Sequence, residues 1–186
     1  MRYFLITLIL LFYIFFFLRA LTLSRSIGKN IKAKNTLLNM SIILASLSSV
    51  IFLGYLSAPP ISEYLLILFS SNLLTIIGSV LITLGLIMST VASITLKKSW
   101  RIGIDENEKT ELITDGIYKI SRNPYFLSYD LVLIGMIFCL LSPFLILAVL
   151  ITIVLFHLMI LKEENYLEKQ HQDNYRPYKK EGRRYI

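Results

Sequence analysis

Charged side chains are scarce in this chain. Asp, Glu, Lys and Arg make up 17% of the 186 residues, whereas soluble domains usually carry about a quarter. Hydrophobic types make up 55%, and the mean hydropathy is +0.67. This balance is typical of a membrane protein and argues against a soluble domain.

The residues that usually bind metals or form disulfides are also few. The single cysteine, Cys139, excludes an intramolecular disulfide and a thiolate metal cluster. The two histidines, His157 and His171, are too far apart in sequence for a usual zinc-ligand spacing. We therefore expect no metal site.

Charge is missing from four long stretches. Residues 3–18, 37–57 and 64–96 contain no charged side chain, and residues 125–161 contain only Asp130. A charge-free run of about 18 residues or more is typical of a transmembrane helix. The last stretch is roughly twice that length, and Pro143 near its middle marks the start of a second helix after a tight turn.

The sequence therefore predicts an all-α integral membrane protein that forms a single membrane domain, residues 1–186. It has five transmembrane helices and a C-terminal helical hairpin. We expect the spans at about 3–21, 37–57, 72–96, 125–141 and 143–161. Residues 64–70 are expected to form a short interfacial piece with a break near Ser71, or else to belong to a longer and strongly tilted helix.

Lysine and arginine concentrate in residues 19–36, 97–124 and 162–186, whereas the turns near 58–63 and 142 contain none. By the positive-inside rule, the N-terminus is predicted outside and the C-terminal tail in the cytosol. The net charge of +7 is then a topology signal, with some attraction to anionic membrane lipids. We expect no nucleic-acid partner, and nothing in the sequence specifies an oligomeric state.

Small residues recur along the predicted helix 72–96 and next to its start. Such spacing lets membrane helices approach closely, so this stripe predicts a packing face and not a binding site. Its members are Ser71, Thr75, Gly78, Gly85, Ser89 and Ala92.

The predicted hairpin brings two polar segments together. Arg122-Asn123-Pro124 begins one helix and Lys162-Glu163-Glu164 ends the other, so both lie at the same membrane boundary. A site here would combine cations, anions and aromatic walls, although charged helix ends and interfacial aromatics also occur without any function. Asp130 is either a functional intramembrane acid or a headgroup-level partner of a lysine. His157 is better explained as a packed or hydrogen-bonded residue.

At these residues the sequence resembles the isoprenylcysteine carboxyl methyltransferase family and the related phospholipid methyltransferases. The first block, LITDGIYKISRNPYF, supplies Gly116, Tyr118, Arg122 and Pro124. The second, KEENYLEKQHQDNYRPYKKEGRRYI, supplies Glu163, Glu164, Leu167, Tyr175, Tyr178 and Arg184. The LKKSW segment that ends at Trp100 is also similar, so the resemblance covers residues 96–186.

The resemblance implies a cofactor-binding region for S-adenosylmethionine within residues 96–186. Arg122 would hold its carboxylate, Glu163 or Glu164 its ammonium, and aromatic faces its sulfonium. The implied cofactor-binding residues are Trp100, Gly116, Ile117, Tyr118, Arg122, Asn123, Pro124, Tyr125, Glu163 and Glu164.

The methyl acceptor stays open between two classes of lipid-linked or hydrophobic molecule. An isoprenylcysteine-type carboxylate is already ionised and needs a cation, for which Arg176 or Arg184 is the candidate. A phospholipid amine must lose a proton, for which Glu164 or Asp130 is the candidate base.

Five positions depart from the family pattern. Asn123 replaces the usual His, Phe126 a Tyr, Ser128 a Gly, and His171-Gln172 a Phe-Gly. Asn123 can donate and accept hydrogen bonds but cannot carry an imidazolium charge. A non-catalytic membrane protein of the same fold therefore stays an alternative, as does an NADPH-dependent reductase of the similar sterol-reductase type.

Overall fold

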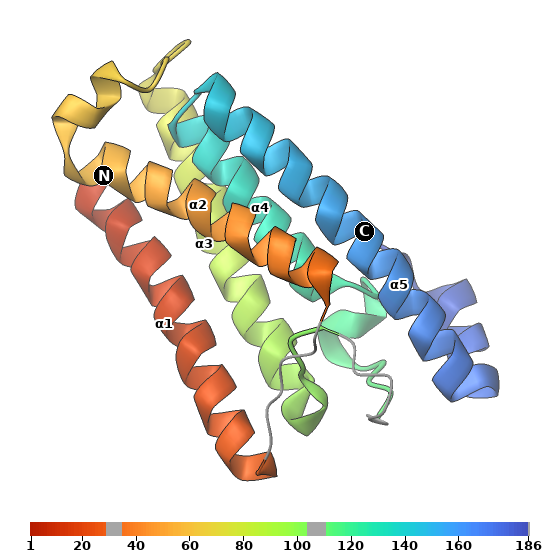
Figure 1. Cartoon of the computed structure of the whole chain (residues 1–186). Coiled ribbons are helices and arrows are strands. Elements are labelled where there is room, and N and C mark those ends of the chain that lie inside the picture. Colours follow the sequence, from red (N-terminus) through yellow and green to blue (C-terminus); the bar gives the residue numbers. More distant parts are fainter. Residues whose placement is uncertain (29–34, 104–110, 186) are drawn as a thin grey trace.

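The computed structural model describes residues 1–28, 35–103 and 111–185, and this part of the chain is helical without strands (Figure 1). Four helices are long and apolar enough to cross a membrane, and α4 is shorter, at 16 residues. The predicted all-α membrane architecture is confirmed. The helices are α1 (Arg2–Ile27), α2 (Thr36–Ser57), η1 (Pro59–Glu63), α3 (Asn72–Thr95), η2 (Lys97–Ser99), η3 (Gly116–Lys119), α4 (Pro124–Cys139) and α5 (Pro143–Glu181).

Local chemistry sets most helix starts. The Asn35 side chain accepts hydrogen bonds from the backbone N–H groups of Leu37 and Leu38, and Ser71 caps α3 in the same way. Prolines occupy the first turn of α4 and of α5, where a missing N–H costs nothing. The predicted breaks at Ser71 and Pro143 are confirmed.

Other boundaries differ from the prediction. Helix α1 begins at Arg2 and continues to Ile27, and α5 continues about three turns beyond residue 161 before its kink at Gln172, because the polar sequence that follows each apolar run still forms helix. Residues 65–70 are extended and not helical. There the Leu68 N–H donates to the Leu141 carbonyl at 2.9 Å, so this segment pairs with the α4–α5 turn.

Helices α3 and α4 pack with their backbones in direct contact. A Cβ atom added at Gly85 would lie 2.7 Å from the Ser128 carbonyl oxygen, and one at Gly135 would lie 2.7 Å from the Gly78 carbonyl oxygen. Only glycine permits this approach. The predicted packing face of residues 72–95 is therefore confirmed, and it fixes where α4 begins.

The two ends of the bundle differ in chemistry. Met1, the end of α2 and the α4–α5 turn lie at one end (Figure 1). The opposite end holds η2, η3, the start of α4 and the polar half of α5. The hairpin thus gathers the polar segments at one boundary, as the sequence predicts.

Helix α5 reverses direction near its end. Gln172 has φ 34° and ψ −100°, a conformation that glycine adopts far more easily than other residues. Beyond it, residues 173–185 turn back toward the start of α4; we call this stretch the returning segment. Gln172 stands where the sequence pattern of the resembled family has a glycine, so this chain makes the reversal with a strained residue.

Replacing Gln172 by glycine should stabilise the protein. The side chain is exposed, and relief of the positive φ should contribute about 1 kcal/mol, net of the entropy that glycine adds to the unfolded chain. The midpoint of thermal unfolding in detergent should rise. The matched control is Gln170→Gly, which places glycine inside regular helix and should lower the midpoint by a similar free energy. A fall for both variants would contradict strain at Gln172.

Candidate functional site

A cavity of about 310 Å³ opens at the polar end of the bundle. Its walls come from α1, α2, the segment after α3, the start of α4 and α5, and they are mostly apolar. Aromatic side chains dominate: Tyr13, Phe16, Trp100, Tyr118, Tyr125, Phe126, Tyr129, Phe156, Tyr166 and Tyr178 line it. Arg101, Glu111, Arg122, Asn123 and Glu163 supply polar groups.

The aromatic wall is held by contacts between distant parts of the chain. Phe16 of α1 packs against Trp100, Tyr125 and Tyr129, with ring centroids 6.2, 5.3 and 5.2 Å away. Trp100 is only 1% exposed. Because α1 thus closes one side of the cavity, the first helix belongs to the site as well as to the membrane anchor.

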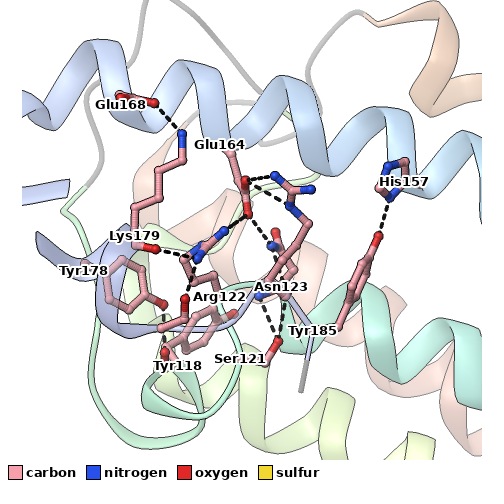
Figure 2. Close-up of polar contacts among 12 residues, drawn as sticks. Tyr118, Ser121, Arg122, Asn123, His157, Glu164, Glu168, Tyr178, Lys179 and Tyr185 are labelled. Carbon is pink, nitrogen blue, oxygen red and sulfur yellow. Dashed lines mark hydrogen bonds and ion pairs between the residues drawn. The ribbon is translucent and has the colours of Figure 1, made fainter. Parts of the chain in front are cut away.

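Behind the cavity, Glu164 is buried between two arginines (Figure 2). Its Oε1 accepts hydrogen bonds from Arg122 Nη2 at 2.9 Å, Arg122 Nε at 3.2 Å and Asn123 Nδ2 at 3.1 Å. Its Oε2 accepts from Arg184 Nη2 at 2.9 Å and Arg184 Nε at 3.1 Å. We call Arg122, Asn123, Glu164 and Arg184 the Glu164 cluster.

Electrostatics keep Glu164 ionised. Burial alone would raise the pKa of this carboxyl, but the hydrogen bonds and charges of Arg184 and Arg122 outweigh it and hold the pKa below its usual range. A buried charge of this kind is stable only with such partners. Every acceptor direction of the carboxylate faces a protein donor.

Arg122 is also committed to the returning segment. Its Nη1 donates to the carbonyl oxygens of Lys179, at 2.9 Å, and of Gly182, and its backbone N–H donates to the Arg183 carbonyl at 2.8 Å. Four of the five guanidinium N–H groups can be accounted for by these contacts within the protein. The predicted grip of Arg122 on a cofactor carboxylate would have to compete with them.

Glu163, the neighbour of Glu164, lines the cavity instead. Burial, followed by the charge of Glu164, raises the pKa of Glu163 to about 7. Two consecutive glutamates thus have different environments, because adjacent side chains on a helix point about 100° apart. Of the two glutamates, Glu163 is therefore the one that a molecule bound in the cavity would meet.

The predicted site residues fall into three groups. Trp100, Tyr118, Arg122, Asn123, Tyr125 and Glu163 line the cavity. Gly116, Ile117 and Pro124 are not among the lining residues: Gly116, with φ 59°, and Ile117 lie in η3, and Pro124 begins α4. Glu164 and Arg184 lie in the cluster behind it, whereas Arg176 is exposed and paired with Asp173 at 3.8 Å.

Asn123 shows how the family's usual histidine can be replaced. Its Nδ2 donates to Glu164 and, at 3.3 Å, to the Arg184 carbonyl, and its backbone N–H donates to Ser121 Oγ. Each of these contacts needs a donor but no positive charge. The departure at this position is therefore compatible with the Glu164 cluster.

Several lining residues were not predicted from the sequence. Arg101, Ile102 and Gly103 follow Trp100, and residues 111–113 approach from the other side. From α2 come Leu38, Ile42, Ala45 and Ser46. Arg101 was visible as one of few cations next to Trp100, but no local pattern separated the α2 residues from lipid-facing ones. Among residues 1–28, 35–103 and 111–185, no group of three or more His, Cys, Asp or Glu side chains could hold a metal ion.

Replacing Glu164 by glutamine should strongly destabilise the protein. Two arginines would then lose their buried counter-ion, which costs about 3 kcal/mol or more in such clusters. The thermal unfolding midpoint in detergent measures this loss.

The matched control is Glu163→Gln. A pKa raised to about 7 means that ionising Glu163 in the folded protein lowers the free energy of unfolding above that pH. Removing this charge should therefore leave the unfolding midpoint unchanged or raise it slightly. Equal losses for both variants would contradict the separate roles of the two glutamates.

One comparison with known proteins bears on this geometry. The sequence model described as phospholipid methyltransferase matches residues 73–174, which is more than half of the chain. The match runs from α3 through the α4–α5 hairpin to the start of the returning segment. No curated protein matches the chain at a significant level.

Proposed function

This chain belongs to the phospholipid methyltransferase family of membrane methyltransferases, and from that premise we propose that it uses S-adenosylmethionine to methylate a lipid-linked or hydrophobic acceptor. The observation that carries the proposal is the cavity at the polar end of the bundle, where Glu163 faces aromatic and apolar walls. The lining residues of this cavity come from the membrane-spanning helices and from the segments that directly follow or precede them.

The cavity's residues fit such a cofactor. Flat aromatic and apolar walls suit an adenine ring, and the faces of Trp100, Tyr118 and Tyr125 suit a sulfonium. When bound, S-adenosylmethionine would supply an electrophilic methyl group. Methyl transfer needs mainly alignment and exclusion of water, and the buried aromatic wall supports both.

Two charged side chains of the cavity match the charges of the cofactor's amino-acid end. Glu163 would hold the ammonium, since its carboxylate lines the cavity while that of Glu164 is fully engaged. Arg122 also lines the cavity and is the cation for the cofactor's carboxylate. The last N–H of Arg122 would add at most one hydrogen bond.

A carboxylate acceptor of the isoprenylcysteine type requires no base, because it is ionised near neutral pH. It requires a cation within reach, and Arg101 and Arg122 are the arginines on the cavity wall. Arg184 is paired with Glu164, and Arg176 is exposed to solvent. We therefore assign the role of holding the acceptor's carboxylate to Arg101. We propose this O-methylation as the first candidate.

A phospholipid amine is the second candidate, and the raised pKa of Glu163 favours it. A carboxyl group with a pKa of about 7 can take the proton that an ammonium must lose before its nitrogen attacks. In this reaction Glu163 acts on the acceptor and not only on the cofactor. The two candidates therefore assign different roles to one residue.

We further propose that the site faces the cytosol and the N-terminus lies outside. Of 19 Lys and Arg residues, Arg2 alone belongs to the opposite end of the bundle in the predicted topology. The positive-inside rule then sets the orientation, and a cytosolic cofactor reaches the cavity directly.

The purified protein in detergent should bind S-adenosylhomocysteine, the product of the proposed cofactor, and should not bind NADPH. Isothermal calorimetry and thermal shift measure both. NADPH binding without S-adenosylhomocysteine binding would indicate the reductase alternative, and binding of neither would indicate a non-catalytic protein. Trp100→Ala should weaken S-adenosylhomocysteine about tenfold through loss of the aromatic wall, with the exposed Tyr64→Ala as its control.

Affinity for S-adenosylhomocysteine should fall as the pH falls through about 7. The ionised form of Glu163 attracts the ammonium, so binding is strongest above its pKa and weakens by about tenfold from pH 8 to pH 6. Glu163→Gln should give weaker and pH-independent binding. A flat profile for the unmodified protein would contradict this role.

The same variant separates the two acceptors. With a prenylated cysteine analogue as acceptor, Glu163→Gln should mainly raise the KM for the cofactor. With phosphatidylethanolamine, it should mainly lower kcat, because the base would be missing.

A further inference from the structure

The returning segment ends against α5 at a second polar contact, away from the cavity. The Tyr185 hydroxyl and His157 Nδ1 form a short hydrogen bond (Figure 2). The two rings are also stacked, with centroids 6.1 Å apart and planes inclined by 26°. Neither residue lines the cavity.

His157 and Glu164 lie on one face of α5. Seven residues separate them, which is about two helical turns or roughly 10 Å. Arg184 and Tyr185 are consecutive in the chain, and they contact Glu164 and His157 respectively. The backbone between them is held as well, because Ser121 Oγ and Asn123 Nδ2 both donate to the Arg184 carbonyl.

Tyr185 keeps its proton in this position. Burial, followed by the nearby Asp130 carboxylate, raises the pKa of its hydroxyl above the usual value. The hydroxyl and His157 Nδ1 share one hydrogen bond, and the histidine tautomer sets which of the two donates. Asp130 Oδ1 is buried without a hydrogen-bond partner in the part of the chain that the structure describes, so the Tyr185 hydroxyl bonds to His157 and not to this oxygen.

We propose that Tyr185 and His157 are positioning residues for the site: their contact fixes the end of the returning segment, which keeps Arg184 on Glu164 and Arg122 in the cavity wall. The part of this inference that concerns cofactor affinity rests on the proposed function. The part that concerns docking of the segment does not.

The returning segment reaches the cavity at two points, which explains why its docking matters there. Tyr178 lines the cavity and donates to the Tyr118 carbonyl at 2.7 Å. Arg122 lines the cavity while it holds the carbonyls of Lys179 and Gly182. If the returning segment were loosened, both Tyr178 and Arg122 would shift in the cavity wall.

Tyr185→Phe tests the contact with the smallest change, since it keeps the ring and removes the hydroxyl. Limited trypsin digestion of the full chain in detergent, read by mass spectrometry, should show cleavage after Lys180 and Arg183 about three- to tenfold faster, as expected for loss of one hydrogen bond. Cleavage after Lys97 is the internal reference. Tyr64→Phe, at an exposed tyrosine, should change neither rate.

Two substitutions of His157 test the partner. His157→Leu should match the effect of Tyr185→Phe and add nothing to it in the double variant. His157→Asn, whose amide reaches the place of Nδ1, should restore slow cleavage. Equal effects of Leu and Asn would overturn the hydrogen bond as the cause.

Affinity for S-adenosylhomocysteine gives the second measurement. Tyr185→Phe should weaken it about three- to tenfold with little change in the unfolding midpoint. Unchanged cleavage overturns the docking inference, whatever the affinity. Faster cleavage with unchanged affinity overturns the positioning role while the proposed function stands. If the unmodified protein does not bind S-adenosylhomocysteine, the proposed function fails and the cleavage rates still decide on docking.

Discussion

The buried carboxylate of Glu164 is the contact on which the rest of the site depends. It joins Arg122 at the start of α4, Arg184 of the returning segment and its own helix α5 into one cluster. In a low-dielectric setting an ionised carboxylate needs this number of donors, and each arginine needs the carboxylate. The cluster therefore holds together three segments that are distant in sequence. The residues of these segments that line the cavity are positioned by the same contacts.

The two consecutive glutamates, Glu163 and Glu164, have different roles. Glu164 is satisfied by the protein and holds the fold, whereas Glu163 lies in the cavity with a pKa raised to about 7 and can respond to a ligand. The charge on Glu164 contributes to that raised pKa. The charge of Glu164 thus affects the ionisation of Glu163 in the cavity, and a sequence motif that looks like two equivalent acids contains two different groups.

The sequence predicted the hairpin, the packing face of α3 and the gathering of polar segments at one end, because hydrophobic periodicity, proline and small-residue spacing act locally. Which member of a charged set would face the cavity depended on side-chain direction after packing, so Glu163 could not be separated from Glu164, nor could Arg101 be recognised beside Arg122 as a lining residue. The contribution of α1 and α2 was also hidden, since Phe16 or Ile42 resembles any lipid-facing residue until the helices are packed. The reversal of α5 at Gln172 could not be predicted either, because glutamine stands where a glycine would have indicated a positive φ.

The cavity has two kinds of wall with different origins in the chain. Residues 73–174, which match the family, supply Trp100, Tyr118, Arg122 and Glu163. Tyr13, Phe16, Leu38, Ile42 and Ala45 come from α1 and α2, which lie outside the match. The first set holds charges and flat aromatic faces that suit a common cofactor, whereas the second is largely apolar and borders the membrane. Because an apolar wall discriminates between ligands by shape and not by charge, the side chains of α1 and α2 would set which hydrocarbon fits beside the polar end in the proposed reaction.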